Sequence, residues 1–160
     1  MDKKINLLVV DDEKVFLESI KKRLELRGFN VVAVDCGEKA LQAADNCSLD
    51  IALLDLKMPG MDGEQTLVEL KKRHPAIEVI ILTGHGSINS AIECTKEGAY
   101  KYLQKPCELE KMMETLSEAY KLNIMRRKML KEKQMENILK TADATEPMDI
   151  LRTLMKLDNE

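Results

Sequence analysis

The feature that most constrains the fold is an alternation of short β-rich runs with helical patterns through the first two thirds of the chain. The expected strands are residues 5–10, 29–34, 51–54, 79–82 and 100–103. Between the first two, Phe16, Ile20 and Leu24 recur at helical spacing until Gly28, which is typical of a C-cap. The further helices are expected over residues 38–44, around Leu67 and Leu70 until Pro75, and over residues 87–97. This alternation predicts parallel strands, right-handed crossovers and helices on both faces of one sheet.

The last third of the chain predicts mostly continuous helix, because residues 107–140 contain neither Gly nor Pro. Its first turns place four apolar residues on one face, namely Leu109, Met112, Leu116 and Ala119. We therefore expect one domain over residues 1–122 and a helical tail over 123–160. Within the tail we expect a linker near 141–146 and a short last helix over 147–157.

The helical tail has a broad, interrupted apolar stripe formed by Ile124, Met125, Met129, Met135, Ile138 and Leu139. Lys128 and Glu132 interrupt the stripe, so the sequence does not decide whether the tail forms a regular coiled coil. The run RRKMLKEK (126–133) holds five basic residues and one acid, which is typical of a solvated helix face; nucleic-acid contact is the alternative. The methionines fit either ordinary packing or an adaptable binding surface. We expect the tail to form a homodimer or to dock on an effector protein.

Composition excludes several classes of protein. The formal net charge of −3 lacks the basic excess of a nucleic-acid-binding domain. Four cysteines without a CxxC pair, together with two histidines, argue against a zinc site and a disulfide framework. The apolar stretch 5–10 is interrupted by Asn6, and no run of apolar residues is long enough to span a membrane. The expectation is a cytoplasmic protein with no membrane partner.

Polar side chains follow four of the five expected strands. Asp11 and Asp12 follow the first, Asp55 the third, Thr83 the fourth, and Lys105 the fifth. Because ligands of open α/β sheets bind beyond the carboxyl ends of the strands, these side chains are expected to converge. Three close carboxylates repel one another unless a cation neutralises them, and hard oxygen ligands suit Mg²⁺. A carboxylate beside such a metal can attack phosphorus, with a lysine and a hydroxyl stabilising the transferred charge.

Each residue also has an ordinary structural interpretation. Asp11 and Asp12 can cap the first helix, Thr83 can be a strand-end hydroxyl, and Lys105 can be a solvated side chain. Only their combination indicates chemistry.

Four separated segments resemble the receiver domain of bacterial two-component response regulators. They are VVDDE (9–13), LLDLKMPGMDG (53–63), ILTGHG (81–86) and YKYLQKP (100–106). The resemblance extends from Lys4 to near Leu122. The pattern over 83–106 is similar to receivers of nitrogen-regulator-type activators, although no P-loop and no helix-turn-helix follows. The resemblance implies a flavodoxin-like sheet with strand order 2-1-3-4-5.

The resemblance also implies roles for single residues. Asp55 would be the phosphoacceptor, attacking the phosphohistidine of a histidine kinase or histidine phosphotransfer protein. Asp11, Asp12, Asp55 and the Lys57 backbone carbonyl would hold Mg²⁺. Lys105 would pair with the phosphoryl group, and its bond to Pro106 would be cis.

Thr83 and Tyr102 match the family's switch pair, in which the hydroxyl moves toward the phosphoryl group and the ring turns inward. The surface of the fourth helix, fifth strand and fifth helix would then signal to a partner. Half-buried packing is the alternative for Tyr102. His85 is either an exposed loop residue or an influence on water access, and Cys107 is either an apolar filler or a helix N-terminal residue favoured as thiolate.

Two other functions are the alternatives to a phosphorylation-dependent signalling switch. An aspartyl-phosphate-forming phosphotransfer enzyme would have a second Asp two residues after its nucleophile, where this chain has Lys57. A flavin-binding electron carrier needs a phosphate-cradling loop after the first strand, where Asp11 and Asp12 would repel phosphate. The sequence therefore favours a signalling regulator over an enzyme.

Overall fold

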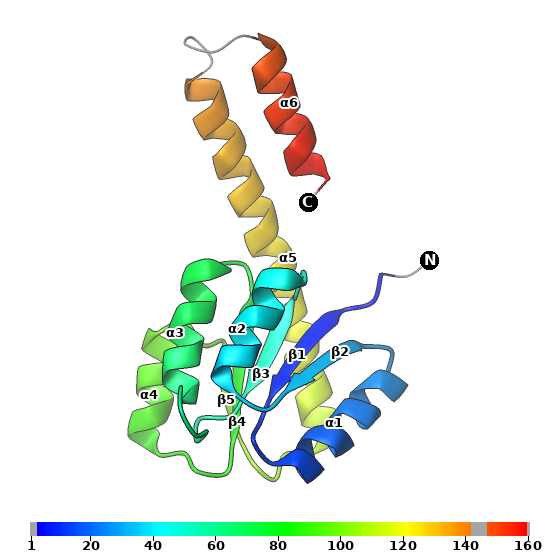
Figure 1. Cartoon of the computed structure of the whole chain (residues 1–160), viewed down its shortest axis with the longest axis vertical. Helices are drawn as coiled ribbons and strands as arrows, with labels where there is room; N and C mark the ends of the chain where they lie inside the picture. The colour runs from blue at the N-terminus through cyan, green and yellow to red at the C-terminus, as the bar shows by residue number, and fades with distance from the viewer. Residues whose placement is uncertain (1–2, 142–146, 160) are drawn as a thin grey trace. The chain divides into compact units, whose positions relative to one another are not determined.

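The computed structural model describes residues 3–141 and 147–159 and divides into two compact units, Met1–Asn123 and Ile124–Glu160. The first unit is built on one sheet whose five strands are all parallel, in the order β2-β1-β3-β4-β5 (Figure 1). The strands are β1 (Asn6–Val10), β2 (Asn30–Val34), β3 (Ile51–Leu54), β4 (Glu78–Thr83) and β5 (Lys101–Gln104). The flavodoxin-like order 2-1-3-4-5 is confirmed.

Helices alternate with the strands as the sequence predicts. They are α1 (Lys14–Leu26), α2 (Gly37–Asn46), α3 (Gly63–Arg73), α4 (Ile88–Lys96), α5 (Leu109–Lys140) and α6 (Pro147–Asp158). Gly28 follows α1 with a φ of 93°, a conformation that side chains with a Cβ rarely adopt, which explains why the helix ends there. The expected helical bounds differ from the observed ones by only a few residues, as is usual for frayed ends.

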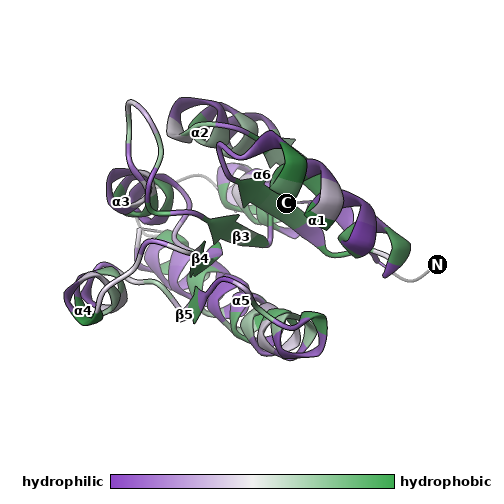
Figure 2. Cartoon of the chain, turned by 90° about the horizontal axis from the view of Figure 1, so that it is seen from below, coloured by the Kyte–Doolittle hydropathy of each residue, from purple (hydrophilic) through white to green (hydrophobic). Residues whose placement is uncertain are grey.

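The sheet of the first unit is covered on both faces (Figure 2). One apolar cluster joins the sheet to α1 and the first part of α5, through residues such as Leu24 and Leu116, both fully buried. The other cluster joins it to α2, α3 and α4, through residues such as Leu67 and Cys94. Strands buried on both faces explain why their sequences are continuous apolar runs rather than alternating patterns.

The second unit consists of the part of α5 from Ile124 onward and of α6. Met125 and Met129 of α5 are exposed, whereas Ile138 is half-buried. In α6, Ile150, Leu154 and Leu157 recur at helical spacing and are half-buried. The expected linker near 141–146 lies outside the described residues except for Thr141. No helix within the described ranges is both long and apolar enough to cross a membrane.

Candidate functional site

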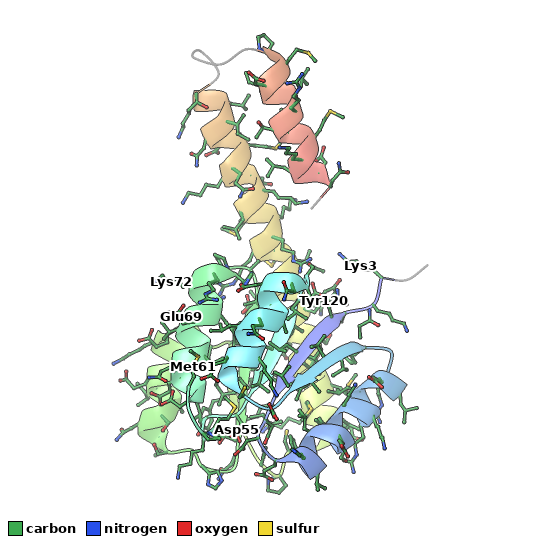
Figure 3. All side chains as sticks on the ribbon, viewed as in Figure 1. Lys3, Asp55, Met61, Glu69, Lys72 and Tyr120 are labelled. Carbon is green, nitrogen blue, oxygen red and sulfur yellow. The ribbon has the colours of Figure 1, made fainter. Side chains whose placement is uncertain are left out.

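Three carboxylates meet where β1 and β3 end. β1 and β3 are parallel neighbours, and Val10 is paired with Leu54, so the residues that follow them lie side by side. One carboxylate oxygen from each of Asp11, Asp12 and Asp55 lies within 4.8 Å of the others. Asp11 and Asp55 are each 2% exposed, whereas Asp12 is exposed. Figure 3 labels Asp55 at this edge of the sheet.

Lys105 brings the positive charge of the site. It follows β5, and its Nζ donates a hydrogen bond of 2.5 Å to Asp11 Oδ2 and lies 3.9 Å from Asp55 Oδ2. Burial raises the pKa of Asp11, although the hydrogen bond from Lys105 acts in the opposite direction. Lys105 thus links two carboxylates that come from different strands.

The Asp55 side chain is oriented by its own loop. Its Oδ1 accepts a hydrogen bond of 2.8 Å from the Leu56 N–H, which leaves Oδ2 as the oxygen nearest Lys105. The loop closes because the Gly63 N–H donates to the Leu56 carbonyl over 2.9 Å. A Cβ at Gly63 would stand 2.6 Å from Leu56 Cα, so only glycine permits this approach.

Thr83 ends β4 beside the same site. It is fully buried, it is paired in register with Gln104, and its Oγ1 accepts a hydrogen bond of 3.2 Å from the His85 N–H. An open cleft of about 540 Å³ lies next to it. The lining residues are Asp12, Leu56, Lys57, Met58, Pro59, Asp62, Glu64, His85 and Ser90. His85 is exposed, and it lines this cleft together with Asp12 of the acidic cluster and Leu56, the residue that follows Asp55.

Tyr102 lies in β5 with its ring half-buried against the cluster below α2, α3 and α4. Its hydroxyl oxygen is buried, and no hydrogen-bond partner for it is present among the described residues. Burial raises the pKa of the hydroxyl. The ring packs directly against Gly86, where an added Cβ would overlap its hydroxyl end. Tyr102 therefore occupies an inward position, and its role in a switch stays a prediction.

The donor set fits a hard divalent cation. Every ligand atom of the acidic cluster is a carboxylate oxygen, and Lys105 is the one cation within 4 Å of Asp11 and Asp55 in the described part of the chain. One ammonium against three carboxylates leaves an excess of negative charge in a largely buried place, which favours a bound Mg²⁺-like ion. Ligation by the Lys57 carbonyl stays a prediction.

Three further residues belong to the site and were missed from the sequence. The Phe16 ring lies beneath the Lys105 ammonium, with Nζ 4.0 Å from the ring centroid. Glu13 Oε1 lies 4.0 Å from the same Nζ. Phe16 fits the apolar periodicity of α1, so the sequence alone does not indicate a contact with Lys105. Gly86 is the third of these residues, since it packs against the Tyr102 ring. Apart from its small size, nothing about it in the sequence indicates this contact.

The structure decides two alternatives that the sequence leaves open, namely helix capping by Asp11 or Asp12 and the state of the Cys107 thiol. The N-cap residue of α1 is Glu13, so neither Asp11 nor Asp12 is the cap of that helix. Asp11 Oδ1 does accept a local hydrogen bond of 2.9 Å from the Glu13 N–H. Of the two alternatives for Cys107, the structure favours the apolar filler over the thiolate, because the side chain packs against an apolar cluster and burial raises the pKa of the thiol. The Lys105–Pro106 bond is cis, as the resemblance implied.

Known proteins with similar sequences are regulators. The chain is 35% identical over 117 residues to the transcriptional regulatory protein GlrR of Escherichia coli K12, covering 73% of this chain and 26% of GlrR. It is 37% identical over 115 residues to the transcriptional regulatory protein ZraR of the same strain, covering 72% of this chain and 26% of ZraR. The chain thus spans about a quarter of the length of these relatives.

Solved structures agree with this assignment. A response regulator receiver domain from Clostridium thermocellum is 40% identical, with a TM-score of 0.67, and covers 79% of this chain and 98% of its own. A CheY-like receiver domain from Methanospirillum hungatei is 27% identical, with a TM-score of 0.74, and covers 78% and 99%. NtrX from Brucella abortus is 27% identical, with a TM-score of 0.73, and covers 79% and 29%.

The family model that matches is the response regulator receiver domain, over residues 7–117. Receiver domains are signalling regulators that histidine kinases phosphorylate, and they typically bind Mg²⁺ at an acidic cluster. The matched range includes every residue of the site described above, and nothing found in the comparisons favours an enzyme. The chain therefore belongs to the response regulator receiver domain family.

Proposed function

We propose that Asp55 is the phosphoacceptor of a phosphorylation-dependent signalling switch. The observation that supports this most directly is the setting of Asp55 Oδ2. This oxygen lies 3.9 Å from the Lys105 ammonium, Asp55 belongs to the three-carboxylate cluster, and Oδ1 accepts a hydrogen bond from the Leu56 N–H. One oxygen is thus fixed and the other is directed toward the positive charge that a phosphoryl group would need.

In the proposed transfer, Asp55 Oδ2 attacks the phosphorus of a phosphohistidine on a histidine kinase or histidine phosphotransfer protein. The new O–P bond forms as the P–N bond breaks, and the imidazole leaves with the electron pair. Lys105 then exchanges its contact with Asp11 for one with a phosphoryl oxygen. Asp11, Asp12, Asp55 and the Lys57 carbonyl would hold Mg²⁺, which supplies charge neutralisation for the incoming phosphoryl group.

The signal is proposed to leave through Thr83 and Tyr102. Thr83 Oγ1 now accepts from the His85 N–H, and it is free to rotate its own proton toward a phosphoryl oxygen. Movement of the loop that follows β4 would change the packing of Gly86 against Tyr102. The readout surface would be α4, β5 and α5, with residues 1–122 as receiver domain and 123–160 as a tail that contributes to homodimer or effector contacts.

Labelling with acetyl phosphate and Mg²⁺ tests the assignment of Asp55. We expect an adduct that is stable in acid and labile in base, and we expect Asp55→Asn to abolish it. The matched control is Asp62→Asn, an exposed carboxylate of the same loop, because Asn also caps a helix well and keeps the start of α3. Equal labelling of Asp55→Asn and the unmodified chain would contradict the proposal.

A further inference from the structure

The loop that joins β3 to α3 is tied to the start of α2. This loop covers residues 55–62, and it carries both Asp55 and the Lys57 carbonyl that is proposed to bind Mg²⁺. The Met61 N–H donates a hydrogen bond of 3.2 Å to Oε1 of Glu38, a residue in the first turn of α2 that lies 23 positions earlier in the sequence. Figure 3 labels Asp55 and Met61, between which the loop runs.

Close backbone packing brings α2 and the loop together at this point. A Cβ added to Gly37 would overlap Thr66 Oγ1 and would stand 3.1 Å from the Met61 carbonyl oxygen, so glycine lets α2 begin this close to the loop. On the other side of the contact, Gly60 has a φ of 78°, and a Cβ there would lie 3.2 Å from Glu38 Oε1. The backbone that carries Glu38 is therefore fixed against the loop, although the side chain itself is exposed.

The other side-chain contacts of the loop come from α3 and from the core. Thr66 Oγ1 of α3 donates to the Asp62 carbonyl over 2.7 Å, and Met58 is buried in the apolar cluster below α2, α3 and α4. Among the hydrogen bonds of the described residues, Glu38 supplies the only side chain outside the loop and α3 that bonds to the loop backbone. The exposed part of the loop is thus attached to α2 through this carboxylate alone.

We propose that Glu38 is a positioning residue for Mg²⁺ binding, and that it acts by holding the loop that carries the Lys57 carbonyl. A backbone ligand on a loop must be kept in place by other contacts, because ordering a mobile carbonyl when the ion binds costs conformational entropy. Glu38 is not a member of the acidic cluster and does not act as a metal ligand itself. The inference rests on the proposed ligation of Mg²⁺ by Lys57.

The charge of Glu38 is a separate effect that the test must distinguish from its hydrogen bond. Hydrogen bonds from the N–H of Glu38 itself and from the Met61 N–H hold the pKa of this carboxyl below its usual value, so it is ionised at neutral pH. A carboxylate attracts a nearby cation through its field, whereas the tie to Met61 needs only an acceptor oxygen. Glutamine has the acceptor without the charge, so Glu38→Gln separates the two effects.

Calorimetric titration of the full chain with MgCl₂, without any phosphoryl donor, measures the effect. Glu38→Ala should raise the dissociation constant for Mg²⁺ by about twofold to tenfold, the range expected for the loss of one hydrogen bond. Glu38→Gln should bind Mg²⁺ nearly as tightly as the unmodified chain. The matched control is Lys39→Ala, which removes an exposed 2.9 Å contact with Asp35 in the same turn of α2 and should not weaken Mg²⁺ binding.

A second measurement needs no metal. Hydrogen exchange of the Met61 N–H in the metal-free chain reports how firmly Glu38 holds the loop. We expect this amide to exchange about twofold to tenfold faster in Glu38→Ala, and at nearly the original rate in Glu38→Gln. Lys39→Ala should leave the exchange rate unchanged.

Two results would overturn the proposal and leave the metal site and the role of Asp55 intact. One is equal Mg²⁺ affinity of the Glu38→Ala chain and the unmodified chain. The other is equal weakening by Glu38→Ala and Glu38→Gln, because the lost charge would then explain the whole effect. If Asp12→Asn does not weaken Mg²⁺ binding, the proposed metal site itself is contradicted, and this inference falls with it.

Discussion

The Lys105 ammonium has partners of two different kinds. On one side it donates to Asp11 Oδ2 over 2.5 Å, and on another it lies 4.0 Å from the centroid of the Phe16 ring. The face of an aromatic ring attracts a cation without accepting a directed hydrogen bond. Phe16 can therefore hold the ammonium in place while its hydrogen bonds change from Asp11 to a phosphoryl oxygen.

Replacing Phe16 tests this positioning role. A cation–π contact of this kind contributes about 0.5–2 kcal/mol, so Phe16→Leu should slow labelling by acetyl phosphate by roughly twofold to thirtyfold. Phe16→Tyr keeps a ring face and should label at nearly the original rate. The measurement is the initial labelling rate at saturating Mg²⁺, with Mg²⁺ affinity determined in parallel.

The chain offers a matched control, because Phe29 is its other phenylalanine and belongs to the same apolar cluster. Phe29→Leu should lower thermal stability without changing the labelling rate. If Phe29→Leu and Phe16→Leu slow labelling equally, loss of packing explains both, and the ring of Phe16 has no special effect on Lys105.

Gly86 is the second residue whose role depends on a single neighbour. Its φ is not positive, so alanine fits the backbone, but its Cβ would overlap Tyr102. Gly86→Ala should therefore destabilise the chain by about 1–3 kcal/mol through overpacking. In a Tyr102→Ala background the same substitution should cost much less. Urea unfolding of the four chains gives the coupling energy, and equal costs in both backgrounds would show that the ring does not set the need for glycine.

For single residues, the sequence predicts the polar side chains that follow the strands better than it predicts the residues that contact those side chains. Asp11, Asp12 and Asp55 could be placed together because parallel strands end at one edge of a sheet. Phe16 could not be assigned to Lys105, because an apolar residue at helical spacing gives the same pattern whether it faces the core or an ammonium. The need for glycine at position 86 depends on the side chain of Tyr102, which lies sixteen residues further along the sequence.

Among the helices, α5 is anchored to a neighbouring loop by the buried side-chain amide of Asn123. Asn123 is fully buried, and its Nδ2 donates a hydrogen bond of 2.7 Å to the Ala76 carbonyl in the loop before β4. It lies at the last position of the first unit, within an unbroken helix. The amide thus fixes one turn of α5 to the loop between α3 and β4.

Removing this amide should weaken the first unit. Asn123→Ala leaves the Ala76 carbonyl without its donor and opens a small cavity, so the expected loss is about 1–3 kcal/mol in the free energy of unfolding. Asn137→Ala is the control, because Asn137 is exposed on the same helix and should change stability by less than about 0.5 kcal/mol. The measurement is urea unfolding followed by circular dichroism. Because alanine favours a helix more than asparagine does, helix propensity cannot cause a loss, and an Asn123→Ala chain as stable as the Asn137→Ala chain would show that the buried amide does not anchor α5.

The sequence predicts these elements well where local signals agree with the fold. Asp62 caps α3, because its Oδ1 accepts a hydrogen bond of 2.9 Å from the Gln65 N–H, and Gln65 Oε1 in turn accepts one of 3.3 Å from the Asp62 N–H. The absence of Gly and Pro likewise anticipates the unbroken α5. The anchoring of Asn123 could not be predicted, because a single polar residue in a long helix usually faces solvent.

For the molecule as a whole, the acidic cluster opposes folding in the absence of a cation. Asp11 and Asp55 are nearly fully buried beside Asp12, and Lys105 supplies one positive charge. Like charges brought together on folding lower stability, whereas a cation that binds only the folded chain raises it by mass action. Stability and metal binding are therefore linked through the same three side chains.

This linkage predicts opposite effects of one substitution with and without Mg²⁺. In EDTA, Asp12→Asn removes a negative charge from the cluster and should raise the thermal midpoint. In the unmodified chain, Mg²⁺ at a hundred times its dissociation constant should add about 2.7 kcal/mol of stability, and the variant should gain far less because it has lost a ligand. Asp45→Asn, an exposed carboxylate remote from the cluster, is the control and should leave the Mg²⁺ effect intact. If Mg²⁺ stabilises the Asp12→Asn chain as strongly as the unmodified one, the ion binds elsewhere, and the three carboxylates are not its site.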